Sequence, residues 1–263
     1  FKIGTTAIGT GTMFALDTSS KISLSNNDSG GTGGSDSTSG NTIFGWKAGE
    51  DIASGGIDNT YFGHNAGNQN TTGDKNTYVG ANAGEGVNGN ANSFNTAIGR
   101  EALLSVTTGS NNTVIGSGSG DALADGEQNV AVGANSLSTS TGIDGTVAIG
   151  YGALNALTSG AGNTAIGFES LKTEDAGSGN VAVGYQALET LNNDNGYNIA
   201  MGHNAMQAAT TAYYNICIGK DAGTAMAAAV PSCVIIGHEA GDAINHADAG
   251  GTVAIGRSAG GAI

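Results

Sequence analysis

The sequence is poor in the residues that would place it among collagens, nucleic-acid-binding proteins or membrane proteins. Proline occurs once, at Pro231, among 263 residues of which 47 are glycine. Collagen is excluded, because it needs abundant proline and a glycine at every third position. Only 8 residues are Lys or Arg against 22 Asp or Glu, so nucleic acids and anionic membranes are poor electrostatic partners. No apolar run approaches the roughly 18 residues of a membrane span, and we expect no membrane insertion.

Cysteine is also scarce. Cys217 and Cys233 are the two cysteines of the chain, too few for a disulfide framework, and we expect both to be small buried side chains. The chain begins and ends abruptly, without a leader sequence, so we expect it to be a piece of a longer protein.

The dominant feature is a repeated unit, Asn-Thr-small-Ile-Gly-x-x-Ala-(Gly/Leu), followed by a polar turn. Thirteen copies follow one another at intervals of 17 to 19 residues. One such unit cannot bury its apolar face alone, whereas stacked units can. We therefore predict an all-β fold, a parallel β-solenoid or β-roll with about 17–18 residues per coil. Residues 41–263 form the thirteen-repeat solenoid, and residues 1–40 form an N-terminal β cap module with a Gly/Ser-rich loop. The anchor glycines of the repeats are Gly45, Gly63, Gly80, Gly99, Gly116, Gly133, Gly150, Gly167, Gly184, Gly202, Gly219, Gly237 and Gly256.

Columns of constant character surround the anchor glycine. The pre-anchor column, one residue before the anchor, is apolar in every copy, as at Ile98 and Ile166, and the strand-start column, three residues before it, is mostly β-branched, as at Thr96. Residues two apart share a strand face, so we predict that both columns point into the interior. The strand-centre column between them, usually small as at Ala97, should point outward toward another backbone or subunit. Three residues after the anchor stands an Ala or Ser in all thirteen copies, which predicts tight packing there.

A coil this thin has little interior, so the sequence predicts an elongated homotrimer about the long axis. Thirteen coils spaced by the distance between neighbouring strands give a rod about 60 Å long.

The repeat resembles a known group of proteins. The segments Asn-Thr-Ala-Ile-Gly at 163–167 and Asn-Val-Ala-Val-Gly-Tyr-Gln-Ala-Leu at 180–188 look like repeats of bacteriophage tail fibres and related virion proteins, and residues 22–28 add to the likeness. The pattern is also related to the shorter head repeats of trimeric autotransporter adhesins. The resemblance covers residues 41–263. It implies a homotrimeric structural fibre segment on a virion or on an extracellular cell surface, which serves host attachment. Its partners would be other segments of the same fibre and a host cell-surface glycan or protein receptor.

The post-anchor column, one residue after the anchor, is the most varied and should face solvent. We predict a candidate exposed binding strip of Trp46, Tyr151, Phe168 and Tyr185, in which the last three stack on consecutive coils. Sugars pack on exposed rings, so a glycan is the ligand that this strip would take. A purely structural aromatic ladder is the plainer interpretation.

We predict no catalytic, cofactor-binding or metal-binding residues, and no enzyme activity. His203 and His238 follow anchors two coils apart, about 10 Å by strand spacing, which is too far to share a metal. The carboxylates are scattered through the turns without the fixed register of calcium-binding repeats.

Two alternatives remain open. A trimeric left-handed β-helix enzyme of the acyltransferase type needs an apolar anchor every six residues, whereas here one strong anchor occurs per coil. An ice-binding solenoid needs a flat threonine array, but the strand-start column changes to Val or Ile in seven copies, which indicates burial.

Overall fold

The computed structural model describes residues 15–16, 22–23, 40–53, 55–87, 89–192, 194–226 and 230–261. Within these residues the chain is all-β, and its one helical element is the short 3-10 turn η1 (Ala247–Ala249), so none of the described helices could cross a membrane. Of the predicted module 1–40, the structure describes an antiparallel pair of two-residue strands, β1 (Ala15–Leu16) and β2 (Ile22–Ser23), and residue 40. Residues 1–14, 17–21 and 24–39 lie outside the described residues.

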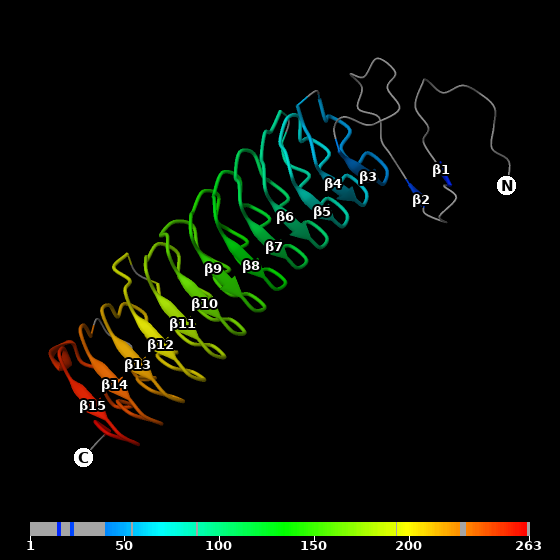
Figure 1. Cartoon of the computed structure of the whole chain (residues 1–263). Coiled ribbons are helices and arrows are strands. Elements are labelled where there is room, and N and C mark those ends of the chain that lie inside the picture. Colours follow the sequence, from blue (N-terminus) through cyan, green and yellow to red (C-terminus); the bar gives the residue numbers. More distant parts are fainter. Residues whose placement is uncertain are drawn as a thin grey trace.

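Thirteen three-residue strands form a single parallel sheet in chain order, which confirms the predicted solenoid (Figure 1). Each strand pairs in register with the strands of the preceding and following coils, so that Thr164, Ala165 and Ile166 align with Val181, Ala182 and Val183. The strands are β3 (Thr42–Phe44), β4 (Thr60–Phe62), β5 (Thr77–Val79), β6 (Thr96–Ile98), β7 (Thr113–Ile115), β8 (Val130–Val132), β9 (Val147–Ile149), β10 (Thr164–Ile166), β11 (Val181–Val183), β12 (Ile199–Met201), β13 (Ile216–Ile218), β14 (Val234–Ile236) and β15 (Val253–Ile255).

The face of the sheet that points inward is the opposite of the predicted one. The strand-centre residues Ala97 and Ala165 are fully buried, whereas the pre-anchor residues Ile98 and Ile166 are 39% and 37% exposed. The strand-start residues are likewise exposed or half-buried in every coil. The prediction that the two large columns fill the interior and that the small column faces outward is therefore wrong. The interior of so thin a coil has no room for large strand residues, because residues after the anchor already occupy it from the opposite wall of the coil.

The interior is filled by a size match between the strand centre and the residue four positions after the anchor. In the coils of β4 and β5 the strand centre is Tyr61 or Tyr78, and the matching residue is glycine. A Cβ added at Gly67 would lie 2.6 Å from the Tyr61 ring, and one at Gly84 would lie 2.4 Å from the Tyr78 ring. In six of the seven coils whose strand centre is Ala, a leucine or methionine fills the space and is fully buried, at Leu103, Leu137, Leu154, Leu171, Leu188 and Met206. The exception is the last coil, where Ala254 faces Gly260.

The asparagine of the repeat, four residues before the anchor, joins one coil to the next. The side-chain Oδ1 of Asn112 accepts the backbone N–H of Asn129 at 2.9 Å, and Asn129 Oδ1 accepts the N–H of Thr146 at 3.0 Å. The Asn129 amide also donates to the carbonyl of Ile143 at 2.6 Å. These asparagines are buried, and buried polar groups need such partners. The interior thus contains a hydrogen-bonded asparagine ladder. Thr146 interrupts it, and it ends after Asn215, because the last two coils have Cys233 and Thr252 at this position.

The anchor glycines are required both by their backbone conformation and by the close approach of the next coil. All thirteen have φ between 126° and 145°, a region closed to other residues. In every coil but the last, a Cβ at the anchor would lie 2.1 to 2.5 Å from the carbonyl oxygen of the next anchor. Stacked coils therefore approach most closely at this column, and only glycine fits there.

Two smaller predictions are also confirmed. The Ala or Ser three residues after the anchor is buried in every coil except that of Gly256, where Ala259 is half-buried. Cys217 and Cys233 are free and buried, and burial raises the pKa of the Cys217 thiol to about 12.

Candidate functional site

The outer face of the sheet is an uncharged, largely apolar surface that runs the length of the solenoid. It consists of the pre-anchor and strand-start columns, which contain only Thr, Val, Ile, Phe and Met in all thirteen coils. Phe44 and Phe62 stack there with ring centroids 5.0 Å apart. With strands of three residues and thirteen coils, this face covers on the order of 600 Å². That is as large as the largest apolar patch of an ordinary monomer.

The predicted exposed strip lies along one edge of this face. The side chains of Trp46, Tyr151, Phe168 and Tyr185 are between 41% and 64% exposed. Tyr151 stacks on Phe168 at 5.4 Å between ring centroids, and Phe168 stacks on Tyr185 at 5.2 Å, as the sequence predicts. The structure extends this ladder by His203, 5.0 Å from Tyr185.

Trp46 does not belong to the same ladder. It stacks on His64 at 4.9 Å, in the coils of β3 and β4, several coils away from Tyr151. The four residues of the predicted strip therefore form two separate aromatic surfaces in one column.

A network of amides and carboxylates accompanies the longer ladder, which sequence reasoning missed. Its members lie two or five residues after the anchor. Glu169 contacts Lys172 Nζ at 2.7 Å and accepts from Gln186 Nε2 at 3.0 Å. Gln207 Nε2 donates to Gln186 Oε1 at 3.1 Å and to Glu189 Oε2 at 2.8 Å. The hydrogen bond from Lys172 holds the pKa of Glu169 below its usual value. Glu169 and Gln186 directly follow ladder residues in the chain, so rings and hydrogen-bonding groups lie at one edge of the solenoid.

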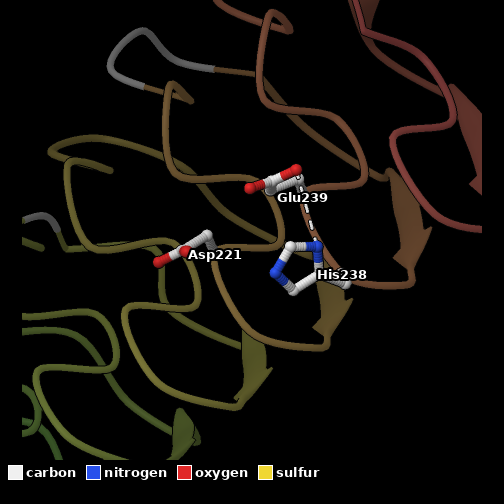
Figure 2. Close-up of side chains that lie close together, drawn as sticks. All are labelled: Asp221, His238 and Glu239. Atoms are coloured by element: carbon white, nitrogen blue, oxygen red, sulfur yellow. Dashed lines mark ion pairs between the residues drawn. The ribbon is translucent and has the colours of Figure 1, made fainter.

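A second cluster lies further along the same edge, where Asp221 follows β13 and His238 and Glu239 follow β14 (Figure 2). One ligand atom from each side chain lies within 4.8 Å of the others. Backbone hydrogen bonds fix this edge, because the N–H of Asp221 donates to His203 and that of Glu239 donates to Lys220, both at 2.9 Å.

The charges of the cluster are partly compensated. The Lys220 ammonium pairs with Asp221 Oδ2, and this hydrogen bond holds the pKa of the Asp221 carboxyl below its usual value. Asn204 Nδ2 donates to Asp221 Oδ1 at 3.1 Å. His238 Nδ1 lies 3.5 Å from Glu239 Oε2, yet this buried nitrogen makes no hydrogen bond. One imidazole and two carboxylates are a donor set that can hold a metal ion.

His203 and His238 lie two coils apart, too far to share a metal directly by strand spacing. The structure brings each of them next to a carboxylate, with His203 Nδ1 4.0 Å from Asp221 Oδ1. The sequence pattern that could have predicted these pairs is a histidine one residue after one anchor and an acidic residue two residues after the neighbouring anchor.

Comparison of the chain with protein-family models, with curated proteins and with solved structures finds no match.

Proposed function

We propose that the chain is a structural segment of a fibre on the surface of a virion or a cell, that it assembles as a homotrimer, and that it has no catalytic role. The observation that carries this proposal is the stack of thirteen in-register coils with one apolar face exposed along its length. A stack of this kind sets a fixed length, because each coil adds one strand spacing of about 4.8 Å.

The apolar sheet face supports assembly from copies of the same chain. Its area of roughly 600 Å² is close to the ~800 Å² that each partner contributes to a stable interface. The face contains no charged residue, although the chain has a formal net charge of −14, so copies can meet there without bringing like charges into contact. Three sheets turned toward one axis would cover all three apolar faces in a closed arrangement.

The aromatic ladder supports a second part of the proposal, the display of a receptor-binding surface. Tyr151, Phe168 and Tyr185 offer exposed rings at regular spacing, and Glu169 and Gln186 offer hydrogen-bonding groups beside them. Sugars combine apolar ring faces with hydroxyl groups, so a host glycan is the receptor class that fits this edge best. A glycan array probed with the wild-type chain and with Phe168→Ala tests this part separately, and equal binding by both would contradict it.

The assembly is tested by measuring the mass of the chain in solution by sedimentation equilibrium over a range of concentrations. We expect a trimer. The double variant Ile149→Lys with Ile166→Lys places charges on the sheet face and should sediment as a monomer with an unchanged circular dichroism spectrum. The matched control, Ser159→Lys with Ala161→Lys, places the same charges on exposed turn residues and should remain trimeric. A wild-type monomer or dimer would overturn the trimer.

Ice binding is a second candidate, because one argument against it was wrong. The threonines of the strand-start column are not buried. Those of β3 and β4 are exposed and those of β5, β6 and β7 are half-buried, which gives five threonines in consecutive coils on the outer face of the sheet. Thermal hysteresis of a dilute solution measures this activity directly, and an acetyl-transfer assay addresses the acyltransferase alternative.

A further inference from the structure

We propose that Asp221, His238 and Glu239 form a binding site for a divalent transition-metal ion of the zinc class, which bridges the coils of β13 and β14. This site is independent of the proposed fibre function. It replaces the expectation that the chain has no metal-binding residues, which rested on the distance between His203 and His238 and on the scattered carboxylates.

The solenoid presets the spacing of the donor atoms. Asp221 and Glu239 occupy the same position in consecutive coils, and their backbones have the same left-handed conformation, with φ of 55° each. The three donor atoms already lie within 4.8 Å of one another. Ligands about 2 Å from a tetrahedral zinc ion are roughly 3.3 Å apart, so the donors must close by about 1.5 Å at most. The side chains of His238 and Glu239 are 41% and 42% exposed, and rotation about their own bonds can supply this movement.

The donor types select the class of metal. Magnesium and calcium prefer sites made of oxygen alone, whereas an imidazole nitrogen suits zinc, copper, nickel and cobalt. One nitrogen and two carboxylate oxygens leave at least one coordination position open to water. His238 Nδ1 is the atom that most needs a partner, because it is shielded from solvent and makes no hydrogen bond. Buried polar atoms in this state are rare, and coordination would satisfy this one.

Lys220 is the group that competes with a metal for Asp221. Its ammonium contacts Oδ2, and its side chain is 54% exposed, so it can turn into solvent when an ion binds. Oδ1 accepts from the Asn204 amide and faces His203 Nδ1 at 4.0 Å, so His203 is a further imidazole close to the site.

His64 shows what the site requires. It lies in the same post-anchor column, stacked on Trp46. The residues two positions after the anchors in its own and the two adjacent coils are Lys47, Asn65 and Asn82, so it has no neighbouring carboxylate in that column. His64 is therefore a matched control within the same chain.

The experiment is a calorimetric titration of the full chain, freed of metal with a chelator, with zinc chloride alone. We expect one zinc per chain. His238→Ala and Glu239→Gln should each weaken binding at least tenfold, because loss of even a residue that only orients a ligand costs about tenfold or more, whereas His64→Ala should bind like the wild type. Lys220→Met removes the competitor and should bind more tightly. Circular dichroism of each variant checks that the solenoid is intact.

Cobalt provides a second readout, because its visible absorption reports the ligand set directly. The wild-type chain should give an absorption band of low coordination number that His238→Ala loses, and millimolar calcium should not displace the ion. The proposal is overturned if zinc does not bind at one per chain, or if His64→Ala and His238→Ala weaken binding equally, since the ion would then be held by scattered surface histidines.

Discussion

At the scale of single residues, the anchor glycine meets two independent demands, one from its own backbone and one from the coil stacked on it. Its φ is positive, and its α-carbon lies against the next anchor's carbonyl group. The chain also has non-glycine residues with positive φ, such as Glu169, Leu171 and Asn204. Positive φ alone therefore does not explain the column of glycines, and the close approach of the next coil does.

This distinction predicts that two glycine substitutions, about one third of a coil apart, lower the free energy of unfolding by different amounts. In Gly150→Ala the new Cβ would lie 2.2 Å from the carbonyl oxygen of Gly167, whereas at Gly145, with φ of 63°, nothing lies within 4 Å. We expect Gly150→Ala to destabilise the fold by about 3 kcal/mol through strain and overpacking. Gly145→Ala should cost about 1 kcal/mol. Thermal melts should show a drop of roughly 10 °C against roughly 3 °C. Similar melting temperatures would show that the coils can separate at this column without cost.

The candidate site was predictable at this scale only in part. Tyr151, Phe168 and Tyr185 occupy one column, so their stacking follows from the period of the repeat alone. The partners Glu169, Lys172 and the Asp221 cluster come from other positions of neighbouring coils. Their contacts depend on side-chain direction at the bend after the anchor, which the period does not specify.

At the scale of the element, the positions and the register of the strands can be predicted from the sequence. Whether a given side chain points into the coil or out to solvent cannot. A three-residue strand such as Thr164–Ile166 has one central and two flanking side chains, and alternation alone is satisfied by either orientation. The assumption that large apolar residues must be inside led to the wrong orientation of the strand. The deciding signal was present: the coils with Tyr61 or Tyr78 have glycine four residues after the anchor, and the coil of Ala165 has Leu171.

The size match predicts compensation between two substitutions in the coil of β7. Val114 faces Gly120 there, with 3.3 Å between a Val114 methyl and a Cβ added at Gly120. Val114→Ala alone leaves a cavity and should cost about 2 kcal/mol. Gly120→Leu alone overpacks and should cost a similar amount. The double variant reproduces the Ala97 and Leu103 pair of the preceding coil. It should keep only the backbone cost of about 1 kcal/mol for a side chain at the positive φ of Gly120, which is a favourable coupling of at least 1 kcal/mol.

The measurement for this cycle is chemical unfolding of the wild type, both single variants and the double variant. Strictly additive losses would mean that the two positions do not share one interior space.

At the scale of the whole molecule, each coil contacts its two neighbours in the sheet, so stability should be nearly a sum over coils and junctions. Deletion of residues 164–180 removes one coil and joins Asn163 to Val181, which restores the repeat. We expect this shorter chain to fold with a melting temperature within a few degrees of the wild type and a rod about 4.8 Å shorter per coil removed. Deletion of residues 164–171 removes half a coil and breaks the register.

Circular dichroism and small-angle scattering compare the two deletions. Equal damage by both would contradict a stack of interchangeable coils and indicate one cooperative core.

The hydrogen bonds that join consecutive strands run along the long axis of the solenoid, and this direction governs how a single chain responds to force. A sideways load is shared by many coils at once. A pull on the two ends instead loads the junctions in series, so that the weakest one yields first and releases its 17 or so residues as slack. One such point is the junction after Thr146, which has no side-chain amide to continue the asparagine ladder. Pulled from its ends, the isolated rod would lengthen in steps, each of which releases one coil.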